Sequence, residues 1–210
     1  PWRESARTAE ELEPRDFPIS EKEVVIWISC AVIFCCVCMS VPIVHLVPLL
    51  TDANFTLEFA TSVLMVLMVC GAFGRILGGM LGDFIGPLPA YIMMSLGQTI
   101  SVVWFPHISV SVGIFLLAAF FGFTYSGVMS SILVCTRVMV SAKFAARAMS
   151  LTSFFGWIGM GLGGYLGGYL FDLQGNYIWS FGFAGSMGAL NLLILWQFWL
   201  RIKSKKRRAD

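Results

Sequence analysis

Long, uninterrupted runs of hydrophobic residues dominate the chain, and short polar stretches separate them. Each run is close to or above the roughly 20 residues that a helix needs to cross a bilayer. Strands of a membrane barrel are about half as long and alternate in polarity, which these runs do not. Because only helices and closed barrels satisfy their backbone polar groups in lipid, the pattern predicts an all-α integral membrane protein with six transmembrane helices. The expected spans are Val24–Leu50, Leu57–Leu81, Leu88–Pro106, Val110–Cys135, Met149–Phe171 and Ile178–Leu200.

The composition supports a membrane protein. Hydrophobic residues make up 58% of the 210 residues and charged residues 12%, against about 45–50% and about 25% in soluble domains. All six cysteines lie within or at the end of hydrophobic runs, so we interpret them as small hydrophobic residues of lipid-embedded helices. A metal site at Cys35, Cys36 and Cys38 is the less favoured alternative, since no histidine or carboxylate falls at ligand spacing beside them. We expect no cofactor, no metal and no nucleic-acid partner.

The basic residues are confined to three segments, with Arg75 as the exception. They lie before the first run, between Arg137 and Arg147, and after Leu200. An even number of runs separates these segments, which therefore share one side of the membrane. The positive-inside rule places that side, with both termini, in the cytoplasm, and we expect a multi-pass protein of the cell membrane.

Both ends of the chain are polar. We expect residues 1–23 to form a cytoplasmic linker, with one short helix around Ala9–Leu12, and residues 201–210 to form a basic cytoplasmic tail. The tail either contacts anionic lipid headgroups or serves as a flank that stops translocation. The chain begins with proline and has no signal peptide, so we expect a fragment or a processed product.

Small residues and prolines mark two of the predicted helices. Gly159, Gly163 and Gly167 follow an i, i+4, i+8 spacing, which forms a smooth stripe for close helix approach. The stripe serves static packing or allows neighbouring helices to slide. In the first helix, prolines flank His45, and interrupted membrane helices often line cavities. His45 either contacts substrate or a proton, or is a packing residue.

The stretch GRILGGMLGDFIGP places Arg75 and Asp83 at the cytoplasmic end of the second predicted helix. Gly86-Pro87 predicts the turn to the third helix. Arg75 lies two turns deeper than Asp83, where an arginine costs at least about 2.5–3.5 kcal/mol on insertion scales and so indicates a function by default. A guanidinium suits a carboxylate ligand; the alternative is a side chain that reaches back to the cytoplasmic interface.

The segment GGMLGDFIG resembles the loop signature of the major facilitator superfamily, through Gly79, Leu81, Gly82, Asp83 and Gly86. The segments HLVPLLTDANFT and GGYLGGYLFDLQGNYIWSF look like helix ends of monocarboxylate-transporter-like members. The resemblance covers residues 24–200. It implies the C-terminal half of the fold, helices 7 to 12, with a missing N-terminal six-helix half as its partner.

The resemblance also implies roles for single residues. Arg75 matches an arginine that binds the substrate carboxylate, whereas Gly71 stands where relatives often have an acid linked to proton coupling. Asp83 would face the start of the fifth helix beside Arg147 and form a cytoplasmic gate, favoured by the helix dipole. No basic residue lies between positions 148 and 200, which argues against a dicarboxylate site. Four aromatic residues either line the apolar side of the site or pack the core: Tyr125, Phe154, Phe155 and Trp157.

The sequence pattern and the family resemblance leave two candidate functions. The first is a secondary transporter of a small organic anion, a monocarboxylate, that works by alternating access with proton symport or exchange. The second is a transporter-like sensor or assembly subunit without a transport cycle, which the departures from the full loop signature at Phe84 and Pro87 favour. Catalytic motifs for hydrolysis or phosphate binding are lacking, and no helix carries paired carboxylates, so we do not expect an enzyme.

Overall fold

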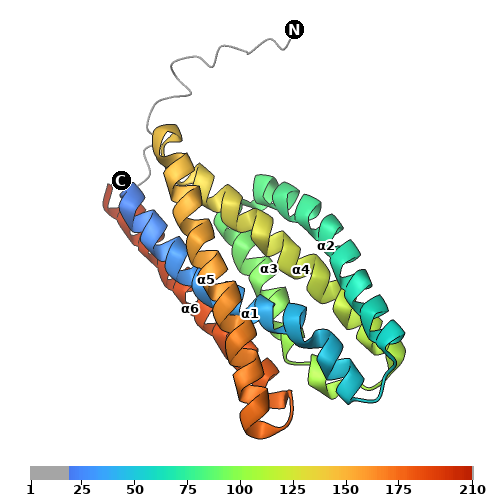
Figure 1. Ribbon diagram of the computed structural model, residues 1–210. Helices are drawn as coiled ribbons and strands as arrows, with labels where there is room; N and C mark the ends of the chain where they lie inside the picture. The colour runs from blue at the N-terminus through green and yellow to red at the C-terminus, as the bar shows by residue number, and fades with distance from the viewer. Residues whose placement is uncertain (1–18, 210) are drawn as a thin grey trace.

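The computed structural model describes residues 19–209, and all of its regular elements are helical. Six long helices follow one another through the described part of the chain (Figure 1). A short 3-10 helix, η2 (Phe105–His107), joins the third to the fourth. The all-α, six-helix prediction is confirmed; the short helix expected around Ala9–Leu12 lies outside the described residues. The long helices are α1 (Glu21–Asp52), α2 (Leu57–Ile85), α3 (Pro87–Val102), α4 (Ser111–Val138), α5 (Ala142–Gln174) and α6 (Ile178–Ala209).

Local signals in the sequence fix the helix ends. The Ser20 and Thr56 hydroxyls cap α1 and α2 by accepting hydrogen bonds from the amides of Glu23 and Phe59, as serine and threonine commonly do. Gly86 separates α2 from α3 with a φ of 93°, a region that glycine enters without steric cost.

Two helices extend furthest beyond their hydrophobic runs. α5 begins at Ala142 rather than near Met149, and α6 continues to Ala209, through the segment expected as a tail. The reason is that hydrophobicity marks the part of a helix that lies in lipid, whereas polar turns such as those carrying Lys143 and Arg147 extend it into water. α1 also continues without interruption through both of its prolines.

Within residues 19–209, five helical stretches have the length and hydrophobicity of a membrane span. They are α1, α2, Pro87–His107, α4 and Ile178–Arg207. α5 is 33 residues long, but its glycines and polar first turns reduce its hydrophobicity. It packs along α1 with one of the two most extensive interfaces of the bundle, which supports the prediction that it also crosses the membrane.

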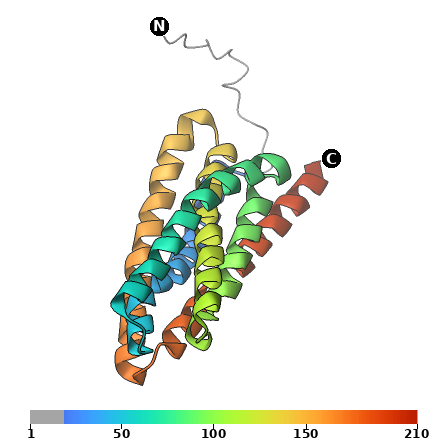
Figure 2. The same ribbon diagram turned by 90° about the vertical axis from the view of Figure 1, so that its right-hand side faces the viewer.

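The bundle is organised around two tightly packed helix pairs, α1 with α5 and α2 with α4. α6 packs against α1, and α3 packs against α4 and α6 (Figures 1 and 2). The pairs meet each other through much smaller interfaces, α1 with α2 and α4 with α5. This arrangement leaves four helices, α1, α2, α4 and α5, to enclose a common space.

One end of the bundle gathers the described basic residues outside Arg75, from Lys22 onward. The start of α1, the α2–α3 turn, the α4–α5 loop and the end of α6 all lie at this end (Figure 1). The Glu21 carboxylate accepts a hydrogen bond from the Ser141 amide at 2.6 Å. The Glu23 carboxylate pairs with Lys205 at 2.9 Å and with Arg201. These contacts join the ends of three helices that are remote in sequence.

Candidate functional site

A cavity of about 350 Å³ lies between α1, α2, α4 and α5. Each helix contributes residues that share one face by helical periodicity. On α2, for example, Met68 and Arg75 are two turns apart, and on α4 Tyr125 and Met129 are one turn apart. The lining among the described residues is Val32, Cys36, Met39 and Ile43 of α1; Met68 and Arg75 of α2; Tyr125, Met129, Ile132 and Leu133 of α4; and Thr152, Ser153, Gly156, Trp157 and Met160 of α5.

Arg75 supplies the only charge among the residues that line this cavity. Its side chain is exposed, and within residues 19–209 no carboxylate forms an ion pair with it. Its backbone is fixed, because the Ser130 hydroxyl donates a hydrogen bond to the Arg75 carbonyl oxygen at 2.8 Å. Arg75 lies ten residues before the end of α2 at Ile85, which is about 15 Å along the helix axis. Among the described residues, Arg75 is thus a charged side chain without an ion-pair partner on a largely apolar wall.

A seam of glycines on α2 places Arg75 against α4. A Cβ atom on Gly74 would overlap the Phe123 carbonyl group, and one on Gly78 would lie 2.6 Å from the Gly127 Cα atom. The two backbones therefore touch, which brings the next residue along α2 beside the cavity face of α4. This seam is not among the features predicted above, although the spacing of Gly71, Gly74, Gly78 and Gly82 is typical of close helix packing.

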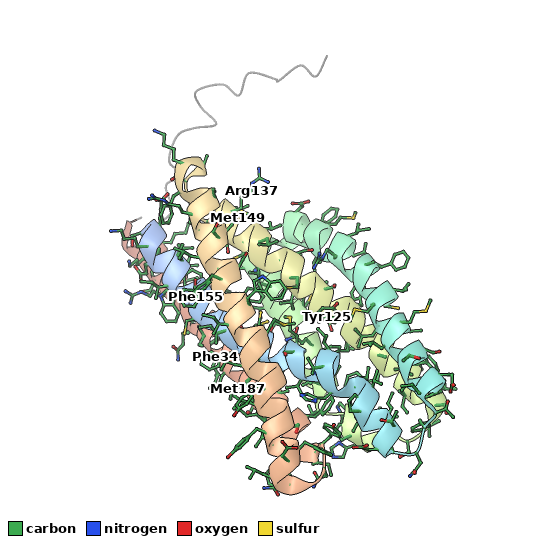
Figure 3. All side chains as sticks on the ribbon, viewed as in Figure 1. Phe34, Tyr125, Arg137, Met149, Phe155 and Met187 are labelled. Carbon is green, nitrogen blue, oxygen red and sulfur yellow. The ribbon has the colours of Figure 1, made fainter. Side chains whose placement is uncertain are left out.

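The hydroxyl groups around the cavity are few. Tyr125 lies at mid-height on α4, far from Arg137 at the basic end (Figure 3). Its ring stacks on Phe121 with a centroid distance of 5.7 Å, and its hydroxyl contacts the Met68 sulfur at 3.5 Å. The Thr152 hydroxyl is buried without a hydrogen-bond partner among the described residues, a state that usually costs about 1–3 kcal/mol unless a ligand or water completes it.

Of the aromatic residues predicted on α5, Trp157 alone lines the cavity. Its side chain is 75% exposed. Phe154 and Phe155 contact each other at 5.6 Å, and neither lines the cavity; Phe155 lies on the side of α5 away from Tyr125 (Figure 3). The structure therefore brings Trp157 and Tyr125 together with Arg75, but not the two phenylalanines.

His45 lies away from this cavity, in the α1–α5 interface. Its Nε2 atom is 2.9 Å from the Gly164 carbonyl oxygen, so the ring carries the proton on Nε2 and donates it to that oxygen. The ring also packs on Tyr177 with a centroid distance of 5.8 Å. This geometry matches the packing alternative for His45.

The glycine stripe of α5 faces α1. Cβ atoms on Gly159 and Gly163 would lie 2.5 Å and 2.6 Å from the carbonyl oxygens of Ile33 and Val37, and one on Gly167 would lie 2.9 Å from the His45 ring. Nothing larger than glycine fits at these positions without movement of α1.

The residues of the loop signature lie at the basic end of the bundle. Gly79 faces open space, a Cβ atom on Gly82 would make ordinary contacts, and Gly86 needs its positive φ. Asp83 is exposed in the last turn of α2, and Arg147 is exposed in the second turn of α5. Within residues 19–209 no ion pair joins these two side chains, and no group of histidine, cysteine and acidic residues is arranged to hold a metal ion.

These features define a multi-pass membrane protein whose helices form half of a carrier fold around a cavity with one cation. The sequence matches the Major Facilitator Superfamily over residues 26–210. The chain belongs to this superfamily, whose members are transporters and not enzymes. It is similar to monocarboxylate transporter 13 of Rattus norvegicus, with 31% identity over 148 residues, and to monocarboxylate transporter 13 of Bos taurus, with 31% identity over 150 residues. Each match covers 70% of this chain and 35% of the relative, so the chain aligns with about a third of their length.

Proposed function

We propose that this chain is the C-terminal half of a secondary carrier that moves a small organic anion, a monocarboxylate, across the cell membrane by alternating access. The observation that carries the proposal is Arg75, which is unpaired among the described residues and exposed to an apolar cavity between four helices. A guanidinium in that setting binds a carboxylate through two parallel hydrogen bonds. The name of the similar transporters points to the same class of substrate.

A second six-helix half would close the cavity. Trp157 and Arg75 are both exposed on the present bundle, so the wall that they form needs a facing surface to exclude water. Carriers of this kind place their binding site at the interface of two repeats near the middle of the membrane. In the proposed orientation the basic end of the bundle is cytoplasmic.

The cytoplasmic gate would use Asp83 and Arg147. Both side chains are exposed at the basic end and free of ion pairs among residues 19–209, so both are available to a partner that approaches in another state of the cycle. Coupling would be proton symport or exchange. Gly71 packs against Ser126 and provides no titratable group at its position.

The first test concerns the anchor. The intact mass of the natural gene product decides whether the carrier is one chain, and that product is then reconstituted in proteoliposomes. We expect Arg75→Ala to weaken carboxylate binding about 10- to 100-fold, which corresponds to about 1.5–3 kcal/mol for hydrogen bonds to a charged group. Arg75→Lys keeps the charge but loses the bidentate geometry, and Arg137→Ala, at the end of α4, is the matched control. Unchanged uptake by Arg75→Ala would remove Arg75 from the site.

The alternative is a transporter-like sensor or assembly subunit. It is favoured by the lack of basic residues after Asp83, where Phe84 and Pro87 stand. The two functions differ in counterflow, which is the exchange of labelled for unlabelled substrate across the membrane. Carboxylate binding with neither counterflow nor net uptake would support the sensor.

A further inference from the structure

Four methionines surround the cavity, one from each of the four helices that enclose it. They are Met39 of α1, Met68 of α2, Met129 of α4 and Met160 of α5. Methionine is flexible and polarisable, and its sulfur makes favourable contacts with aromatic rings. Because every wall carries one, a ligand in this cavity meets a thioether on each side that the chain provides.

The described lining contains one charged residue, Arg75. Arg75 can neutralise a single carboxylate, and the described lining offers no second cation for a dianion. It also offers no carboxylate to an ammonium group, so a zwitterionic amino acid would leave its positive charge against thioethers and aliphatic carbons. An unpaired charge in such surroundings is costly.

The apolar part of the lining extends well beyond Arg75. Trp157 adds an exposed indole ring, and the cavity volume of about 350 Å³ falls in the range of sites for drug-sized ligands, about 300–1,000 Å³. An acid of two or three carbons would leave most of this surface without a contact.

We infer that the substrate is a monocarboxylate with a large apolar body, an aromatic ring above all, whose carboxylate binds Arg75 and whose ring lies among the four methionines and Trp157. This inference rests on the proposed function, because it assumes that the cavity is the substrate site. It also predicts selectivity. The site should bind aromatic or bulky apolar monocarboxylates more tightly than short hydroxy acids, zwitterionic amino acids and dicarboxylates.

The test compares 3-phenylpropionate, which has the ring and one carboxylate, with three other acids. Lactate lacks the ring and carries a hydroxyl group, phenylalanine adds an ammonium group, and phenylsuccinate adds a second carboxylate. Binding to the purified natural gene product is measured by the ligand-dependent rise in its Tm, which needs no transport. We expect the Kd for 3-phenylpropionate to be at least tenfold lower than that for each of the other three probes.

A variant then separates the apolar wall from the anchor. We expect Trp157→Ala to raise the Kd for 3-phenylpropionate about tenfold and that for lactate less than twofold. Trp179→Ala, on α6 and outside the cavity lining, is the matched control and should change neither value. Met129→Gln should act like Trp157→Ala, since it replaces a thioether by a polar group of similar length.

The outcomes distinguish the inference from the proposed function. Binding of lactate, phenylalanine or phenylsuccinate as tight as that of 3-phenylpropionate would overturn the selectivity but leave the carboxylate site in place. Equal losses for 3-phenylpropionate and lactate in Trp157→Ala would also overturn it. If no carboxylate binds and Arg75→Ala changes nothing, the proposed function itself fails.

Discussion

Gly74 of α2 and Phe123 of α4 bring two helix backbones into direct contact, because a single Cβ atom on Gly74 would overlap the Phe123 carbonyl group. This contact lies one residue before Arg75. The position of Arg75 beside the cavity therefore depends on the absence of a side chain at Gly74.

We expect Gly74→Ala to destabilise the protein by about 1–3 kcal/mol, the usual cost of forcing extra atoms into a packed interface. Gly79→Ala is the matched control on the same helix, since a Cβ atom there meets nothing within 4 Å and alanine favours a helix over glycine by up to about 1 kcal/mol. Thermal unfolding in detergent measures both. Equal Tm values for the two variants would show that α2 and α4 are not held this closely.

The second prediction asks whether His45 is a packing residue or a residue that carries a proton. We expect His45→Ala to cost about 1–3 kcal/mol, because it removes a hydrogen bond to Gly164 and the contact with Tyr177. His45→Gln retains a donor and should be milder. The pH dependence of uptake should be the same for His45→Gln and for the unmodified carrier; a profile that loses its pH dependence would assign a proton role to this histidine.

The contacts of Glu23 with Lys205 and Arg201 link α1 to α6 at the basic end. Such pairs on a surface usually contribute up to about 1 kcal/mol. We expect Glu23→Gln to lower the Tm slightly at low salt and to have less effect at high salt, where the pair is screened. Lys206→Gln is the control, since no described acid pairs with Lys206. A salt-independent loss would point to packing of the side chain instead.

The orientation of the bundle can be measured directly. The start of α1, the α4–α5 loop and the end of α6, which carry described basic residues, lie at one end of the structure, and the positive-inside rule assigns that end to the cytoplasm. We expect an epitope placed after Asp210 in the natural gene product to react with antibody in permeabilised cells and not in intact ones. One placed in the α5–α6 loop, at Gly175, should react in both. The reverse pattern would invert the proposed orientation.

The helices could be predicted from the sequence because lipid imposes a long hydrophobic run on every span. The start of α5 could not, since Ala142 begins the helix in a polar stretch that no hydrophobic signal marks. The boundary depends there on a tertiary hydrogen bond between the Glu21 carboxylate and the Ser141 amide, which the sequence of α5 alone does not reveal.

The candidate site also contains residues that the sequence predicts and residues that it does not. Arg75 is detectable from sequence because a charge inside a hydrophobic run is rare and costly. The contribution of α1, through Met39 and Ile43, is not detectable from sequence. Apolar residues of a membrane helix are the same types whether they face protein, lipid or a cavity. Trp157 lines the cavity and Phe154, one turn earlier, does not; the sequence could not tell them apart, because the rotation of α5 follows from its glycine contacts with α1.

Direct contact of the backbones within each helix pair, α1 with α5 and α2 with α4, also bears on how such a protein can diverge. The glycines that hold the pairs together and the methionines that surround the cavity occupy different positions on the same helices, with Gly156 at the border between them. After gene duplication, one copy of the protein could therefore replace its cavity methionines one by one and bind new substrates. Its helix pairs would be unaffected, because the glycines that hold them together would not change.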